Sequence, residues 1–179
     1  MTETQILGSV REATAADACA ILRIYAPHVE TSAVSFETHL PSLEEMAGRI
    51  ETNRKLGWYV YEQDGEVLGY AYASKHRDRA AYQWCCEVSA YVDERSRGKG
   101  LATLLYERLL RELKTKGYVN AYAVITLPNE RSVSFHEKRG FKSIGVYEKI
   151  GFKLGRWHDV GWWALRINEP CDAPVVPAS

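Results

Sequence analysis

The chain has 179 residues, with 23 Lys plus Arg and 23 Asp plus Glu, so its formal net charge is zero. A chain of this length can bury the core of one domain, and a balanced charge argues against binding dominated by nucleic-acid phosphates or an acidic membrane surface. No apolar run is long enough to cross a bilayer, the first residues lack the basic-then-apolar pattern of a signal peptide, and the four cysteines show no metal-ligand spacing. We therefore expect a soluble cytoplasmic enzyme that binds no metal.

The first part of the chain predicts a short strand followed by two helices. The strand is expected at 10–13. Each helix begins with a capping-box signature, Thr14 with Asp17 in the first and Ser42 with Glu45 in the second. Apolar residues at helical spacing follow both signatures, so each helix is expected to bury one face.

Strands are predicted for the middle of the chain. A hairpin is expected from 58–63 and 66–74, because Asp64-Gly65 between them is a two-residue turn signal. The polar connector at 75–79 then leads into a long strand from about 82 to 92.

A glycine-rich basic turn, Arg95-Ser96-Arg97-Gly98-Lys99-Gly100, separates that strand from an amphipathic helix that begins at Leu101. This arrangement builds an anion site, because glycine allows close backbone approach and the first helical N–H groups point at the ligand. The spacing excludes the two common nucleotide loops, GxxxxGK[ST] and GxGxxG. We expect a phosphate or pyrophosphate to bind here.

The last part of the chain predicts a strand at 120–126, a short helix from Asn129 to Gly140, and two further strands at 141–147 and 162–167. One domain is therefore expected at 10–167. It is flanked by a flexible N-terminus at 1–9 and by a proline-containing, disordered tail at 168–179.

The chain resembles the GNAT superfamily of acyl-coenzyme-A-dependent N-acyltransferases, first because its turn matches the pattern [RQ]-x-x-G-x-[GA] and then because its elements follow the GNAT order β-α-α-β-β-β-α-β-α-β-β. Within that superfamily it is similar to the phosphinothricin and methionine sulfoximine acetyltransferases. The matching blocks are SFET at 35–38, AYQW at 81–84, EVSAYV at 87–92, LPN at 127–129, FHE at 135–137 and GRWHDVG at 155–161. The resemblance implies an α+β fold with a mixed, mostly antiparallel sheet, helices on both faces and two central strands that splay apart. It also implies a homodimer.

The resemblance further implies acetyl transfer from acetyl-CoA by direct attack of the α-amine of a small amino-acid-like substrate. The amine must lose a proton first, and Glu87, an acid on the strand before the turn, is the candidate base. A salt-bridge role for Glu87 stays open. His136 stands where many members of the superfamily have tyrosine, and it is expected to orient groups, to relay protons as a base with Glu87 or an acid for the thiol, or to serve structure alone.

The remaining site residues follow from the resemblance. Backbone groups of Tyr91 and Val92 are expected to pair with the pantetheine arm, and 95–101 to hold the pyrophosphate, whereas Asn129 either contacts the arm or caps a helix. The cofactor-binding residues are thus Tyr91, Val92, Arg95, Ser96, Arg97, Gly98, Lys99, Gly100, Leu101 and Asn129. The expected substrate-binding residues are Phe36, Lys75, Arg77 and Arg79. The other interpretation of the three cations is a solvated run of charges.

Other aromatic residues and alternative functions remain open. Three roles are open for Trp157, His158 and Trp162: they line the site, cross a dimer interface or pack in the core. Packing in the core is the more common role of large aromatic residues. His28, His39 and His76 are expected at the surface without partners. The alternatives keep the fold but change the acceptor to a polyamine, an aminoglycoside or a protein N-terminus, or make the chain a non-catalytic acyl-CoA sensor. The cationic connector disfavours the first two acceptors.

Overall fold

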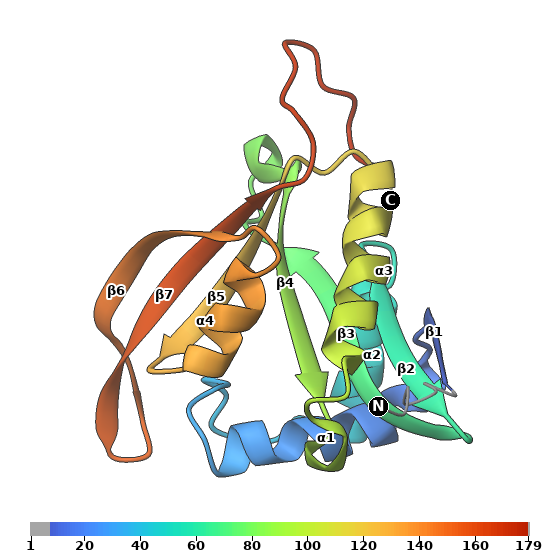
Figure 1. The fold of residues 1–179 in the computed structure, drawn as a ribbon, viewed down its shortest axis with the longest axis vertical. Helices are drawn as coiled ribbons and strands as arrows, with labels where there is room; N and C mark the ends of the chain where they lie inside the picture. Colours follow the sequence, from blue (N-terminus) through green and yellow to red (C-terminus); the bar gives the residue numbers. More distant parts are fainter. Residues whose placement is uncertain (1–7, 179) are drawn as a thin grey trace, which may run out of the picture.

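The structure, a computed structural model, describes residues 8–178. Over this part of the chain, the helices and strands follow the predicted order in one mixed sheet with α-helices packed on it (Figure 1). In chain order the elements are β1 (Ser9–Glu12), α1 (Ala18–Glu30), α2 (Leu43–Asn53), β2 (Trp58–Gln63), β3 (Glu66–Lys75), β4 (Cys85–Val92), α3 (Leu101–Thr115), β5 (Asn120–Leu127), α4 (Glu130–Glu137), β6 (Lys142–Lys153) and β7 (Arg156–Arg166). Short 3-10 turns lie at Ala15–Asp17, Ala80–Tyr82 and Glu94–Ser96.

The sheet has the strand order β1-β2-β3-β4-β5-β7-β6, and β4 and β5 are its parallel neighbours. Their pairing begins at Cys85 and Asn120 and ends at Glu87 and Tyr122. Beyond these residues the two strands diverge, and Figure 1 shows their C-terminal ends apart. The expected splay of two central strands is therefore present.

Two hydrophobic cores hold helices on the two faces of the sheet. Leu105 and Leu109 of α3 are fully buried in one core, together with Cys86 and Val88 of β4. The other core joins α1 and α2 to the opposite face of β2 and β3. Because side chains of a strand alternate between the faces, β4 contributes to both layers.

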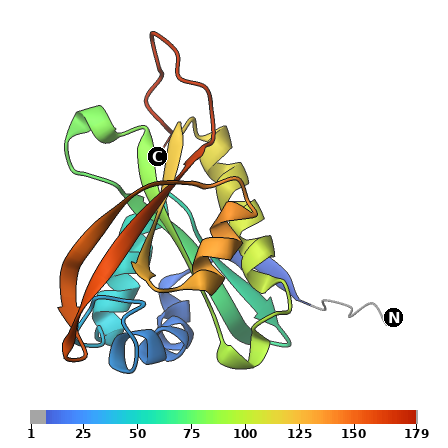
Figure 2. The ribbon, with the colours of Figure 1, turned by 60° about the vertical axis from the view of Figure 1, so that its left-hand side comes forward.

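Most predicted boundaries lie within three residues of the observed ones, and the differences that matter concern β4, β6 and β7. The strand expected from about 82 begins at Cys85, because Tyr82 and Gln83 donate their N–H groups to carbonyls of Arg79 and Ala80 and close a 3-10 turn. The last two strands are longer than expected and form a hairpin that extends away from the rest of the sheet (Figure 2). The pairing of β6 with β7 shifts register at two places. Each shift breaks the period-two alternation of side chains by which one long strand could be predicted from the sequence.

The termini contact the domain where they are described. Most of the predicted flexible segment at 1–9 lies outside the described residues, but the Gly8 N–H donates to the Tyr61 hydroxyl at 3.1 Å. The tail has no helix or strand, although the Trp84 indole donates to the Val175 carbonyl at 2.9 Å and Ala178 N–H bonds the Lys116 carbonyl at 3.0 Å. The disorder of the tail stays a prediction. Within residues 8–178, no helix is long and apolar enough to span a membrane.

Candidate active site

The turn before α3 has the backbone of an anion site. Gly98 and Gly100 have φ values of 81° and 84°, and Gly100 is the N-cap of α3. A Cβ at either glycine would meet no atom within 4 Å, so the backbone here is open to a ligand. Ser96 and Leu101 are buried and anchor the turn, whereas Lys99 is exposed beside it. The Thr103 N–H donates to the Gly100 carbonyl at 2.9 Å, whereas the N–H groups of Leu101 and Ala102 have no acceptor among the described residues and are free to bind an anion.

The two arginines of the turn are engaged in ion pairs. Arg95 binds Asp93 at 2.9 Å and Glu66 at 2.7 Å, and its hydrogen bonds lower the pKa of the Asp93 carboxyl. Arg97 binds Glu94 at 2.7 Å. These pairs stabilise the shape of the turn, so an anion would be met first by backbone N–H groups and by the neighbouring lysine.

An open strand edge leads from the turn toward the middle of the sheet. Pairing of β4 with β5 ends at Glu87, so Tyr91 and Val92 pair with β3 on one side and have no β5 partner on the other. Such an edge can accept an extended chain as an added strand. Asn129 caps α4, because its Oδ1 accepts the Ser132 N–H at 3.1 Å. This settles the helix-cap role of Asn129 and leaves its contact with a pantetheine arm as a prediction.

Glu87 lies at the point where the strands separate and has two cationic or titratable neighbours. Its Oε1 is 3.0 Å from His76 Nδ1 and 3.5 Å from an Arg77 guanidinium nitrogen. The His76 ring stacks on Tyr122, with centroids 4.7 Å apart. The structure therefore brings together Glu87, Arg77 and a histidine that the sequence analysis had not assigned to the site.

His136 is buried on α4 with both ring nitrogens engaged. Nε2 is 2.9 Å from the Tyr106 hydroxyl, and Nδ1 is 2.8 Å from the Ser132 carbonyl oxygen. A carbonyl only accepts, so Nδ1 carries the proton and Nε2 accepts from the tyrosine. Burial lowers the pKa of His136, and the ring is neutral in this arrangement.

Glu87 and His136 do not meet. Cys86 and Val88 point into the core beneath α3, in which Tyr106 is also buried. Glu87 lies between them in β4 and points to the opposite face of the sheet. The two expected catalytic residues therefore flank the sheet from different sides.

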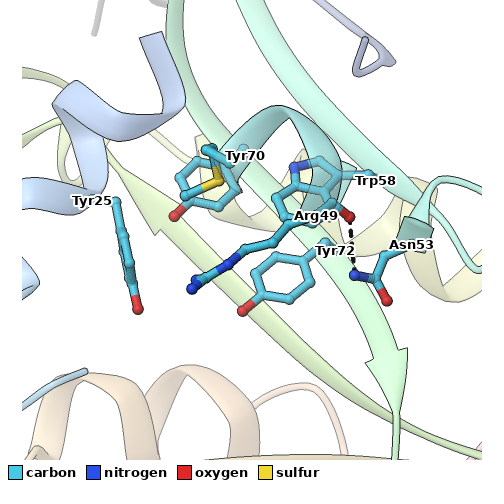
Figure 3. A pocket seen from close by; sticks show the side chains of 7 residues that line it. Tyr25, Arg49, Asn53, Trp58, Tyr70 and Tyr72 are labelled. Carbon is cyan, nitrogen blue, oxygen red and sulfur yellow. Dashed lines mark hydrogen bonds between the residues drawn. The ribbon is translucent and has the colours of Figure 1, made fainter. Parts of the chain in front are cut away.

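A small cavity of about 50 Å³ lies on the same face as Glu87, between α1, α2 and the sheet (Figure 3). Arg49 reaches into this region and binds Glu37 with two hydrogen bonds of 2.6 and 3.3 Å. The lining residues are Tyr25, Met46, Arg49, Asn53, Trp58, Tyr70 and Tyr72. This cavity was not predicted from the sequence, although Tyr70 and Tyr72 share one face of β3 and Arg49 lies between the buried Met46 and Ile50 of α2.

The expected substrate residues come from two segments of the chain. Phe36 is part of the α1–α2 loop, is 39% exposed, and packs against Gly151 of β6 and His158 of β7. Lys75 ends β3 and Arg79 precedes the 3-10 turn, and both are exposed. Of the three cations, the structure places Arg77 beside Glu87.

The structure also shows where two further tryptophans and the remaining histidines of the sequence predictions lie. Trp157 does not pack in the core, because it is 59% exposed on β7, whereas Trp162 is half-buried and lies under the Arg77 guanidinium. His39 is exposed as expected, but His28 is partly buried, with its ring 5.0 Å from that of Tyr91, and burial lowers its pKa. The surface prediction is wrong for His76, whose side chain is 14% exposed.

A mixed sheet with two diverging strands and an anion-binding turn is the architecture expected of an acyltransferase. The family described as "Acetyltransferase (GNAT) domain" matches residues 10–162. The chain is 38% identical to phosphinothricin N-acetyltransferase of Streptomyces viridochromogenes, over 95% of this chain and 94% of that protein. It is 32% identical to the L-methionine sulfoximine/L-methionine sulfone acetyltransferase of Pseudomonas aeruginosa, over 93% and 98%.

A solved structure shows the same fold. The phosphinothricin acetyltransferase of Sinorhizobium meliloti, solved in complex with acetyl-CoA, superposes with a TM-score of 0.86 at 32% identity, covering 94% of this chain and 96% of that one. This chain belongs to the GNAT family, and it is an N-acetyltransferase.

Proposed function

We propose that this protein transfers an acetyl group from acetyl-CoA to the α-amine of a small amino-acid-like acceptor such as phosphinothricin or methionine sulfoximine. The relatives named above support this acceptor class. The observation that carries it is the adjacency of Glu87 and Arg77, 3.5 Å apart at the splay of β4 and β5. An α-amino acid bears an ammonium and a carboxylate on one carbon, and these charges match the carboxylate and the guanidinium.

The residues of the turn and of β4 fit acetyl-CoA. The open backbone at Gly98 and Gly100, the N-terminus of α3 and Lys99 would hold the pyrophosphate, and the free edge at Tyr91 and Val92 would align the pantetheine arm. Ser96, Leu101 and the ion-paired Arg95 and Arg97 would hold the turn in shape. When bound, acetyl-CoA supplies the activated acetyl group.

Glu87 would prepare the acceptor by removing a proton from its ammonium. An alkyl ammonium whose pKa lies two to three units above the ambient pH costs roughly 3–4 kcal/mol to deprotonate. A carboxylate held against the amine can offset part of that barrier. Of the roles considered for His136, its engaged nitrogens and its place on the other face favour positioning α4 over acting as a base beside Glu87.

The remaining acceptor contacts fit the same face. Arg77 would hold the acceptor carboxylate in a fork of two hydrogen bonds, and Lys75 and Arg79 would attract anionic acceptors to the connector. Phe36 would cover the acceptor from the α1–α2 loop. A polyamine or an aminoglycoside, in contrast, would meet cations where it needs acids.

A thiol-release assay with acetyl-CoA over a panel of acceptors tests this function. We expect turnover with amino acids and their phosphinic or sulfoximine analogues, and none with polyamines, aminoglycosides or peptide N-termini. In the variant Arg77→Gln the KM for the acceptor should rise about tenfold while the KM for acetyl-CoA stays the same. Arg111→Gln, on the exposed face of α3, is the matched control. Turnover confined to polyamines, or acetyl-CoA binding with no turnover, would contradict the proposal.

We further propose that the enzyme is a homodimer. The β6–β7 hairpin exposes a row of large apolar side chains, each 47–59% exposed: Ile144, Val146, Tyr147, Ile150, Phe152, Leu154 and Trp157. A second copy of the chain would remove this surface from water, because contiguous apolar patches of this kind mark association sites. Sedimentation equilibrium should give twice the chain mass, and a monomer at micromolar concentration would refute the dimer.

We also infer a cytoplasmic location. Its support is that the four cysteines are free thiols in the described residues, as is usual in a reducing compartment. Cell fractionation tests it.

A further inference from the structure

His76 is the one histidine in direct contact with the carboxylate that the proposed function uses as its base. It follows β3 directly and reaches back over the sheet to Glu87 of β4, with Nδ1 3.0 Å from Oε1. Its ring is fixed on three sides, stacked on Tyr122 and edge-on to Tyr82 and Trp162 at centroid distances of 5.8 Å. A side chain held this firmly can fix the orientation of its partner.

The hydrogen bond has a defined direction. A carboxylate only accepts, so the His76 ring nitrogen Nδ1 carries a proton and donates it to Oε1. Arg77 approaches the same oxygen at 3.5 Å, and no described residue is bonded to the other carboxylate oxygen, Oε2. The pair of donors therefore turns one oxygen of Glu87 toward the protein and leaves the other for the amine.

We propose that His76 is the positioning residue of Glu87: its Nδ1–H bond to Oε1 aims Oε2 at the acceptor amine. In each turnover the amine gives its proton to Oε2 of Glu87, the His76 ring keeps its Nδ1–H bond to Oε1, and Glu87 then returns the proton to solvent. This inference rests on the proposed function, because it requires Glu87 to be the base.

Two substitutions test whether the donor at position 76 aims Glu87. His76→Asn keeps a donor near the position of Nδ1, so kcat should stay within about threefold of the wild type with an unchanged KM for acetyl-CoA. His76→Phe keeps the stacked ring but removes the donor, so kcat should fall about tenfold with an unchanged KM for acetyl-CoA. His39→Asn, at an exposed histidine of the α1–α2 loop, is the matched control and should leave kcat unchanged.

The same assay distinguishes failure of this inference from failure of the base assignment. Glu87→Gln should lose turnover by about 10²–10⁴-fold, and full activity in that variant would overturn the role of Glu87 and this inference with it. If Glu87→Gln is inactive but His76→Phe retains the wild-type kcat, the inference alone is wrong. Thermal unfolding of every variant identifies those that fold; His76→Gln replaces His76→Asn, and His76→Leu replaces His76→Phe, if either does not.

Discussion

The hydrogen bond between Tyr106 and His136 joins the two helices α3 and α4 inside the protein. Tyr106 is fully buried and His136 is 7% exposed, and the hydroxyl lies 2.9 Å from Nε2. The substitution Tyr106→Phe removes this hydroxyl and leaves the ring in place. It therefore leaves a buried imidazole nitrogen without a donor while the packing of the helices is kept.

The magnitude follows from the burial of the bond. A net intramolecular hydrogen bond contributes about 0.5–1.5 kcal/mol, and an unsatisfied buried acceptor costs about 1–3 kcal/mol. We expect the free energy of unfolding to fall by about 1–2 kcal/mol, which in a chain of this size lowers Tm by roughly 2–8 °C. His136→Phe removes the other end of the bond, so the double variant should show a coupling energy of about 1 kcal/mol.

Urea denaturation of the wild type, both single variants and the double variant measures the coupling, and the thiol-release assay measures kcat on the same proteins. We expect Tyr106→Phe to keep kcat within about threefold, because Glu87 lies on the opposite face of the sheet. Tyr82→Phe, at a tyrosine that is 41% exposed, is the control for stability and should change it by less than about 0.5 kcal/mol.

Two results would refute this reasoning. Strictly additive stability changes would mean that the bond contributes nothing. A hundredfold loss of kcat in a Tyr106→Phe protein of unchanged stability would place His136 and Tyr106 in proton transfer rather than in positioning.

Two further predictions concern the turn and the pH dependence of stability. Gly100→Ala and Gly117→Ala place a Cβ at φ values of 84° and 90° with free space around it. Both substitutions should lower stability by about 1 kcal/mol, but only Gly100→Ala should raise the KM for acetyl-CoA. Equal effects on this KM would mean that the turn is not part of the cofactor site. Burial lowers the pKa of both His28 and His136, so the folded state binds fewer protons than the unfolded state below about pH 6.5, where unperturbed imidazole titrates. Stability to urea should therefore fall as the pH drops from 7 to 5.5, and it should fall less in His136→Phe; an equal slope in that variant would contradict the burial argument.

Much of the site could be read from short segments. The turn at 95–100 is predicted as an anion site from local properties, two glycines and a helix start, and the structure shows the positive φ values and the helix start. The cap at Asn129 and the β2–β3 hairpin are local for the same reason. Their signals lie within a few residues of the positions they determine.

The partners of the site residues could not be read in this way. His76 and Glu87 are 11 positions apart, and Tyr106 and His136 are 30 apart, so no spacing pattern joins them. The separation of Glu87 from His136 depends on which face each strand position turns to the core, and that is decided by the packing of α3 on β4. The sequence therefore left open whether His136 works with Glu87, acts on the thiol or serves structure alone.

By itself the sequence determined the family, the order of the elements and the glycine turn before α3, because each depends on local patterns or on blocks that match relatives. Only the tertiary structure decided which groups touch Glu87, which face His136 occupies and that the β6–β7 hairpin exposes its apolar side chains. Those properties arise from contacts between segments that are distant in the chain. Such contacts depend on strand register and on the packing of helices over the sheet, and neither is encoded at any single position.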